Sequence, residues 1–210
     1  MRQRTIVFDF GGVLFNTSAV DFYRERFQKQ GRSEEELQYF LNEIFTNKDR
    51  AEANIGTVEE VVAKKAKQHP EWADDILAFG TPEAYIKHIR SVMPGMKEVL
   101  DDIERNGDRI VGLTNWASDA YDVIPQAFPD ILAHFNKVVV SGKVHLKKPS
   151  PEIFQLAQKE FGNPAAAAVY FFDDKADNVE TAKKVTRWKA FVFKDANTVR
   201  QALALPAKAR

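Results

Sequence analysis

The chain contains five short apolar runs in which hydrophobic residues are continuous rather than alternating. They begin at Thr5, Arg109, Lys137, Ala168 and Lys189 and read TIVFDF, RIVGLT, KVVVSG, AVYFFD and KAFVFKD. Continuous runs of this length are typical of strands in a sheet whose two faces are both covered by helices. The pattern therefore predicts five buried parallel strands.

Helical patterns accompany these strands. Residues 94–107 have helical apolar spacing and end in Gly107, and residues 150–162 begin with Ser150 as a predicted N-cap and Pro151 in the first turn. A third helical pattern, DNVETAKKV, follows the fourth strand. Alternation of buried strands and helices predicts an α/β fold with a doubly wound parallel sheet.

The segment between the first and second strands is too long for one crossover helix, and its pattern is helical throughout. Ser33 with Glu36, and Thr57 with Glu60, have the spacing of capping boxes, and TPEAYIKHIRSVM at residues 81–93 reads as a further helix. We therefore predict a core formed by residues 1–15 and 93–210, with a helical cap formed by residues 16–92. An insertion after the first strand lies above the sheet edge where open α/β sheets bind ligands.

Composition narrows the possible partners and compartments. The chain has 210 residues, of which 44% are hydrophobic, and its 30 Lys and Arg residues balance 30 Asp and Glu residues. Such a balance gives no reason to expect nucleic acid or an acidic membrane as a partner. The absence of cysteine excludes disulfides and thiolate chemistry, and no apolar run is long enough for a membrane span. We expect a cytoplasmic protein.

Polar residues stand at the ends of the predicted strands. Asp9 ends the first strand, Thr114 ends the second, and Asp173 and Asp174 end the fourth; two lysines, Lys147 and Lys148, lie after the third. The carboxyl ends of parallel strands share one edge of a sheet, so these side chains are expected to converge. Neighbouring carboxylates need a cation between them, and their oxygen ligands suit Mg²⁺.

This set of side chains is suited to phosphoryl transfer. An aspartate can attack phosphorus and form an aspartyl-phosphate, which divides one difficult displacement into two easier ones. The Thr114 hydroxyl can hold phosphoryl oxygens, and a lysine can stabilise both the nucleophile and the developing negative charge. The glycines after Asp9 allow the backbone to approach an ion and a phosphate closely.

Four motifs occur in order along nearly the whole chain: DFGGV, LTN, KKPSPEIF and FFDDKADNVETA. With these motifs the sequence resembles the haloacid dehalogenase-like (HAD) hydrolase superfamily, in particular members with a helical cap after the first strand. The first and last motifs are most similar to the branch of small sugar-phosphate phosphatases. The resemblance implies a Rossmann-like core with strand order 3-2-1-4-5. It also implies an Mg²⁺-dependent phosphatase acting on a small phosphorylated metabolite, such as a sugar phosphate.

The resemblance also assigns catalytic roles. It implies that Asp9 is the nucleophile and that Thr114 is the phosphate-binding hydroxyl. Lys148, which directly precedes a proline, fits the motif lysine better than Lys147 does. Thr114, Lys148 and the adjacent Asn115 are expected to contact the substrate.

Metal-binding roles follow in the same way. The resemblance implies that Asp9 and Asp174 bind Mg²⁺ and that Asp173 is a second or outer ligand. Gly11 would contribute its backbone carbonyl. By position alone, Trp116 and Asn16 are further candidates for lining the pocket, and His145 is a candidate substrate contact.

One position departs from the family pattern. Most phosphatases of this superfamily have a second aspartate two positions after the nucleophile, which protonates the leaving group and later activates water. Here that position is Gly11. General acid–base help is typically worth about 10²–10⁴-fold in rate. A slow phosphatase is one interpretation, and a phosphate-binding or regulatory protein with weak catalysis is a second.

A third interpretation is a 2-haloacid dehalogenase-type hydrolase that also uses Asp9. That reaction attacks carbon and needs no divalent ion. The pair Asp173 and Asp174 argues against it, because buried carboxylates without a cation are costly.

Overall fold

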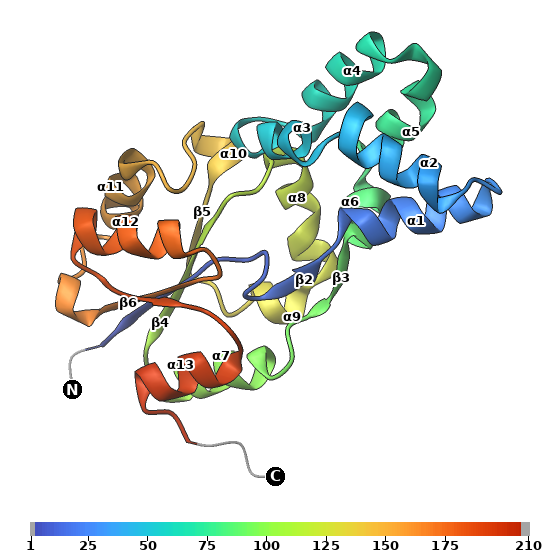
Figure 1. Cartoon of the computed structure of the whole chain (residues 1–210). Coiled ribbons are helices and arrows are strands. Elements are labelled where there is room, and N and C mark those ends of the chain that lie inside the picture. Colours follow the sequence, from blue (N-terminus) through green and yellow to red (C-terminus); the bar gives the residue numbers. More distant parts are fainter. Residues whose placement is uncertain (1–2, 207–210) are drawn as a thin grey trace.

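The computed structural model describes residues 3–206 and is built around a five-stranded sheet (Figure 1). All neighbouring strands are parallel, and their order is β5-β4-β1-β6-β7, which confirms the predicted order 3-2-1-4-5. The strands are β1 (Thr5–Phe8), β4 (Arg109–Thr114), β5 (Lys137–Val140), β6 (Val169–Asp173) and β7 (Lys189–Val192). The central strand is β1, where Val7 pairs with Val111 on one side and Phe171 on the other. This arrangement places the residue that follows β1 in the middle of the sheet edge.

Helices cover both faces of this sheet. They are α7 (Met96–Arg105), α8 (Ser118–Ala127), α9 (Pro129–Leu132), α10 (Ser141–Val144), α11 (Pro151–Glu160), α12 (Ala176–Thr186) and α13 (Ala196–Leu203), with a 3₁₀ turn η4 (Ala166–Ala168) before β6. The predicted helices within 94–107, 150–162 and 177–185 are therefore present as α7, α11 and α12. Ser150 stands at the N-cap of α11, but its hydroxyl bonds to Glu152 instead of a backbone N–H.

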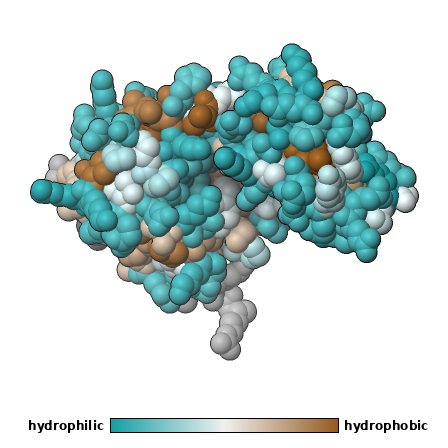
Figure 2. Space-filling model, turned by 45° about the horizontal axis from the view of Figure 1, so that its top comes forward, coloured by the Kyte–Doolittle hydropathy of each residue, from teal (hydrophilic) through white to brown (hydrophobic). Residues whose placement is uncertain are grey.

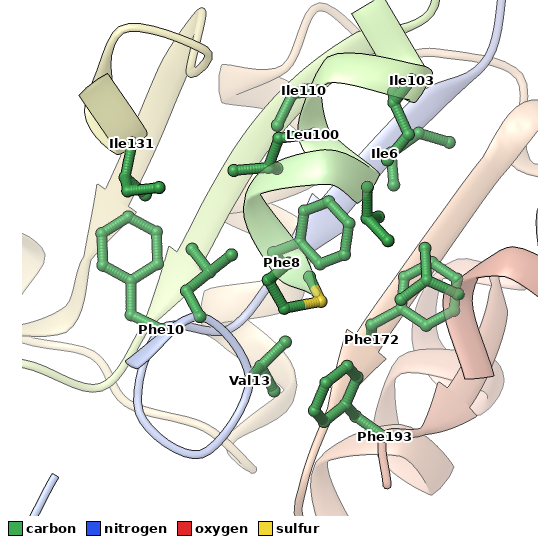
Figure 3. Packing of buried hydrophobic residues seen from close by; sticks show 14 of the residues in the cluster. Ile6, Phe8, Phe10, Val13, Leu100, Ile103, Ile110, Ile131, Phe172 and Phe193 are labelled. Carbon is green, nitrogen blue, oxygen red and sulfur yellow. The ribbon is translucent and has the colours of Figure 1, made fainter. Parts of the chain in front are cut away.

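Alternate residues of β1 point into two different apolar clusters. Ile6 and Phe8 pack in the cluster that contains α7 and α13, whereas Val7 packs in the cluster that contains α11 and α12. Figure 3 shows Ile6 and Phe8 close to Leu100 of α7 in the first cluster. This two-sided burial explains why the strand reads as a continuous apolar run.

The segment predicted as the cap, residues 16–92, is mainly helical and lies on the sheet edge. Its elements are α1 (Ala19–Lys29), α2 (Glu34–Tyr39), a π-helical turn η1 (Phe40–Ile44), α3 (Asn47–Glu52), η2 (Ala53–Ile55), α4 (Val58–Gln68), η3 (Pro70–Trp72), α5 (Ala73–Ala78) and α6 (Pro82–His88). The cap has an aromatic core of its own around Tyr23, Phe40 and Phe79. The capping box of Ser33 and Glu36 is confirmed at the start of α2.

The expectation that residues 16–92 hold helices alone is wrong at both ends. The helix expected over residues 81–93 ends at His88, and β3 (Ile89–Val92) pairs antiparallel with β2 (Phe15–Thr17). The chain enters and leaves the cap at neighbouring points, so these two segments can satisfy each other's backbone groups. Two flanking bonds extend the ribbon, from Ser18 N to His88 O at 2.9 Å and from Met93 N to Leu14 O at 2.8 Å.

The cap is also attached to the core away from this ribbon. Asp119 of α8 accepts hydrogen bonds from the N–H groups of Val58 and Glu59, at 2.9 and 3.0 Å, and from the Tyr85 hydroxyl at 2.9 Å. A core carboxylate thus binds the N-terminus of cap helix α4, where free N–H groups favour an anion. The cap is held over the sheet edge at two separate places.

This contact corrects a prediction about α4. Thr57 accepts a bond from Glu60 N at 3.1 Å, as expected of a capping residue. The return bond from the Glu60 side chain is not formed, so the predicted capping box is half present. Asp119 satisfies two of the other N–H groups of the first turn instead.

The surface seen in Figure 2 is largely hydrophilic over both the cap and the core. Among the helices within residues 3–206, none has the length and apolarity needed to cross a membrane.

Candidate active site

Carboxylates from two strand ends meet at the edge of the sheet beneath the cap. Oxygen atoms of Asp9, Asp173 and Asp174 all lie within 4.8 Å of one another. The Nζ atom of Lys148 lies 3.0 Å from Asp9 Oδ1 and 2.6 Å from Asp173 Oδ2. The structure therefore brings together four residues that are up to 165 positions apart in the sequence (174 − 9).

Asp9 follows β1 and is almost completely buried. Its backbone N–H bonds to Phe172 O at 2.9 Å, and its Oδ1 atom accepts a bond from Phe10 N at 2.7 Å. Burial raises the pKa of Asp9 to about 6; Lys148 lowers this pKa, and the charge of Asp173 raises it. Backbone hydrogen bonds thus fix the orientation of the Asp9 carboxylate, and the Lys148 ammonium group partly neutralises its charge.

Asp173 is fully buried, and both of its oxygens are already bonded. Its Oδ1 atom accepts from Lys175 N at 2.9 Å and from Asn178 Nδ2 at 2.8 Å, while Oδ2 accepts from Lys148 Nζ. Asn178 was not singled out from the sequence. The sequence feature that could have identified it is its position in the first turn of α12, five residues after Asp173. From there the amide can reach back to the end of the strand.

Asp174 is exposed toward the cavity and lies against Gly12. A Cβ atom added to Gly12 would stand 2.9 Å from Asp174 Oδ2, and Gly12 has a left-handed φ of +76°. Glycine is therefore required at this position for two reasons, the backbone conformation and the close approach of the carboxylate. Desolvation and the neighbouring charge of Asp173 raise the pKa of Asp174.

Thr114 ends β4 with a fully buried side chain. Its Oγ1 atom has no hydrogen-bond partner within the described part of the chain. Buried hydroxyl groups are rarely left unpaired in folded proteins. The hydroxyl predicted to bind phosphate is therefore available for an additional partner.

Lys148 uses all three of its ammonium donors inside the protein. Besides the two carboxylates, Nζ donates to Leu113 O at 2.7 Å. Burial alone would lower the pKa of Lys148, but Asp9 and Asp173 more than offset this effect and raise it. Lys148 therefore stays charged. It is buried between the two carboxylates, whereas Lys147 is exposed, so the geometry favours Lys148 as the motif lysine.

Asn115 fixes the segment that carries Lys148. Its Nδ2 donates to Lys148 O and its Oδ1 accepts from Lys148 N, both at 2.8 Å. Asn115 lines the cavity, and its role as a substrate contact stays a prediction, because both ends of its amide already have partners in the protein.

We expect Lys148→Met to destabilise the metal-free protein by about 3–5 kcal/mol, because it leaves two buried carboxylates without their common cation. The matched control is Lys147→Met, which removes one exposed charge from the adjacent position and should change stability by less than about 0.5 kcal/mol. Urea unfolding at mildly alkaline pH, with a chelator present, measures both effects. Equal effects of the two substitutions would show that Lys148 does not hold the two carboxylates together.

A cavity of about 980 Å³ lies between the core and the cap and opens onto these groups. The core contributes Asp9, Gly11, Asp174 and the predicted candidate Trp116 to its walls. Asn16, at the base of the cap, also lines it. The cap contributes residues not singled out from the sequence, among them Gln38, Asn42, Asn47, Lys48, Arg50 and Asn54.

His145 has a different environment. Its side chain is exposed, and its Nδ1 atom lies 2.9 Å from Ile55 O in the cap. The residue thus contacts the segment that docks the cap on the core, and its role as a substrate contact remains a prediction.

The space beside Gly11 is open. A Cβ atom added there would meet only the Thr17 hydroxyl, at 3.9 Å, which is an ordinary contact distance. The backbone at position 11 therefore has room for an acid–base side chain, and crowding does not explain the glycine. Thr17 is the nearest group that could form a hydrogen bond at this point.

The sequence is similar to known proteins along most of its length. Residues 3–186 match a family model described as haloacid dehalogenase-like hydrolase. The chain is 24% identical over 188 residues to protein CbbY of Rhodobacter capsulatus, covering 84% of this chain and 79% of that protein.

Solved structures share the fold at low sequence identity. A HAD family enzyme from Bacteroides thetaiotaomicron, BT-2542, in complex with magnesium and inorganic phosphate, superposes with a TM-score of 0.65 and 18% identity, covering 92% of this chain and 96% of that one. The L-2-haloacid dehalogenase of Xanthobacter autotrophicus, with chloropropionic acid covalently bound, gives a TM-score of 0.62 and 18% identity, covering 90% of this chain and 76% of that one.

Proposed function

Because this chain belongs to the haloacid dehalogenase-like hydrolase family, we propose that it is an Mg²⁺-dependent phosphatase of small phosphorylated metabolites, with Asp9 as its nucleophile. The observation that carries this proposal is the charge balance of the site. Three carboxylates share one ammonium group, so two negative charges are left without a partner. Such a balance suits a divalent cation.

The residues present fit a hard metal ion. Asp9 and Asp174 would hold it through carboxylate oxygens, and Gly11 through its backbone carbonyl, because all three line the cavity. Asp173 would be an outer ligand that does not contact the metal directly, since its oxygens are already bonded to Lys148, Lys175 and Asn178. When bound, Mg²⁺ neutralises the site and polarises the phosphoryl group.

Asp9 would carry out the reaction in two steps. In the first, an Asp9 oxygen forms a bond to phosphorus, the bond from phosphorus to the ester oxygen breaks, and the leaving alkoxide takes up a proton from solvent. In the second, water attacks phosphorus and loses a proton to solvent, the bond from phosphorus to the Asp9 oxygen breaks, and inorganic phosphate leaves the restored Asp9 carboxylate. Thr114 and Lys148 would stabilise the charge on the phosphoryl oxygens and on the nucleophile.

A sugar phosphate is the substrate class that this pocket favours. Its cap wall carries several side-chain amides, such as Asn42, Asn47 and Asn54, and amides pair with hydroxyl groups of polyols. The fold neighbour that holds magnesium and inorganic phosphate supports phosphoryl chemistry for this arrangement.

We expect the protein to release inorganic phosphate from at least one member of a sugar-phosphate panel in the presence of Mg²⁺. A chelator should abolish this release, and added Mg²⁺ should restore it, because the carboxylates repel the substrate's phosphate unless a cation lies between them. Two other results would contradict the proposal. Halide release from chloroacetate that persists in the chelator would indicate a dehalogenase. Tight binding of phosphate without any turnover would indicate a binding protein.

A further inference from the structure

Two consecutive residues of strand β2, which together with β3 forms the neck of the cap, face the same cavity. Asn16 and Thr17 both line it, although successive side chains of a regular strand point to opposite faces. The pairing with β3 changes register at this step, because Asn16 pairs with Ser91 and Thr17 pairs with Ile89. Irregularities of this kind increase the twist of a strand and turn its side chains in a new direction. The neck thereby presents Thr17 to the cavity.

The hydroxyl group of Thr17 lies next to Gly11 and is not used within the protein. Apart from the chain neighbours of Gly11, its Oγ1 atom is the only heavy atom of the described residues within 4 Å of a Cβ atom added there, at 3.9 Å. No residue among 3–206 forms a hydrogen bond with this hydroxyl. It is therefore free to bind a water molecule in the cavity.

The short loop between Asp9 and Thr17 holds this hydroxyl in place. Phe15 N donates a hydrogen bond to Phe10 O at 2.9 Å, and a backbone bridge joins Phe15 to Gly11. These contacts fix the start of β2 against the residues that follow the proposed nucleophile. A group that orients a reactant must be held in this way, because small errors of placement cost much of its effect.

The second step of the proposed reaction needs a correctly placed water molecule. Displacement at phosphorus proceeds roughly in line, so the water must attack from the side opposite the Asp9 oxygen, which is the side where the leaving group departed. Gly11 has no side chain that could hold water there. A water molecule bonded to Thr17 Oγ1 at about 2.8 Å would lie beside Gly11, in the space that a longer side chain would fill.

We infer that Thr17 is a positioning residue for this step, and the inference rests on the proposed phosphatase function. Its hydroxyl accepts a hydrogen bond from the attacking water and holds that water in line with the bond from phosphorus to Asp9. The water oxygen forms a bond to phosphorus, the electron pair of the breaking bond returns to the Asp9 carboxylate, and one water proton passes to solvent. Thr17 keeps its own proton, so it orients the water without acting as a base.

Two substitutions separate the hydroxyl group from the shape of the side chain. Thr17→Val keeps the branched shape, which suits a strand, and removes the hydroxyl. Thr17→Ser keeps the hydroxyl and loses the methyl group. The matched control is Ser91→Ala, because Ser91 carries an exposed hydroxyl in the same neck and is not among the described residues that line the cavity.

The test follows the loss of phosphate from Asp9. Each protein is phosphorylated with labelled nitrophenyl phosphate and Mg²⁺, chased with an excess of the unlabelled ester and quenched in acid at intervals. Thr17→Val should lose its label roughly 10-fold more slowly than the wild type, the effect of about one neutral hydrogen bond, whereas Thr17→Ser and Ser91→Ala should stay near the wild-type rate. The kcat/KM for the same ester, which reports the first step, should be unchanged in all three variants.

The possible outcomes distinguish this inference from the proposed function. Label that leaves Thr17→Val at the wild-type rate, or that Thr17→Ser retains equally long, would overturn the inference and leave the phosphatase proposal in place. A parallel fall of kcat/KM in Thr17→Val would show that the substitution disturbs the whole site, and it would also count against a specific role in the second step. Absence of label from Asp9 in every protein would refute the proposed function and the inference together.

Discussion

Asp9→Asn should reduce phosphate release by about 10⁴–10⁶-fold and leave the protein folded. The loss is large because an amide cannot attack phosphorus. Removing the nucleophile alone typically lowers the rate about as much as removing all the catalytic residues that act together with it. The fold should persist, since an asparagine oxygen can still accept the bond from Phe10 N, and Lys148 keeps Asp173 and Leu113 O as partners.

Two measurements test the prediction for Asp9→Asn. Phosphate release is followed with the best substrate of the panel, and thermal unfolding is compared with that of the wild-type protein. Asp130→Asn is a suitable control, because Asp130 is an exposed residue whose pairing with Lys97, at 3.5 Å, is loose. Activity retained by Asp9→Asn, with Mg²⁺ present, would refute the assignment of the nucleophile.

Gly11→Asp should have the opposite effect and raise turnover of alkyl phosphates by about 10²–10⁴-fold. The new carboxylic acid would protonate the leaving oxygen and then activate water in the second step. The site has room for it, because a Cβ atom at Gly11 meets only Thr17 Oγ1 at 3.9 Å and the backbone conformation is not left-handed. The carbonyl of residue 11 is kept, so its proposed contact with the metal is retained.

Leaving-group dependence makes this prediction specific. Nitrophenyl phosphate has a stable leaving group that needs little protonation, so Gly11→Asp should increase its kcat/KM, which reports the first step, less than that of a sugar phosphate. Gly11→Asn is the matched control, with nearly the same size and no transferable proton. An unchanged rate for sugar phosphates, or an equal gain with asparagine, would show that proton transfer at this position does not limit the reaction.

The sheet could be predicted from the sequence because its strands are buried on both faces. Val7 and Phe8 belong to opposite apolar clusters, so the strand has no polar face and the run is unmistakable. The site could be predicted for a related reason. Once the strands are parallel, Asp9 and Asp173 must lie at one edge, whatever their separation in the chain.

The cap was predicted less completely, because its neck and its contacts depend on distant residues. The strands β2 and β3 are short, and Ile89–Val92 directly continues a helical pattern. Asp119 caps α4 across 61 sequence positions, and no local pattern encodes such a contact. Arg26 and Arg32 of the cap share Asp75 as an ion-pair partner, which the sequence does not reveal either.

The lack of an acid–base side chain at Gly11 should also determine which of the two steps is slower. Both steps of the proposed reaction need a proton transfer, but the second also needs a water molecule activated next to phosphorus. Without an aspartate at position 11, hydrolysis of the aspartyl-phosphate should be slow relative to its formation from a substrate with a good leaving group. The intermediate should then accumulate on the protein.

Accumulation allows a direct measurement on Asp9. The wild-type protein is mixed with nitrophenyl phosphate and Mg²⁺, quenched in acid within the first turnovers, digested and analysed by mass spectrometry. The proposed chemistry predicts one phosphoryl group on the peptide that contains Asp9, absent when Mg²⁺ is chelated and absent from Asp9→Asn. Steady phosphate release from a protein whose Asp9 peptide is never modified, or modification of a different residue, would contradict it.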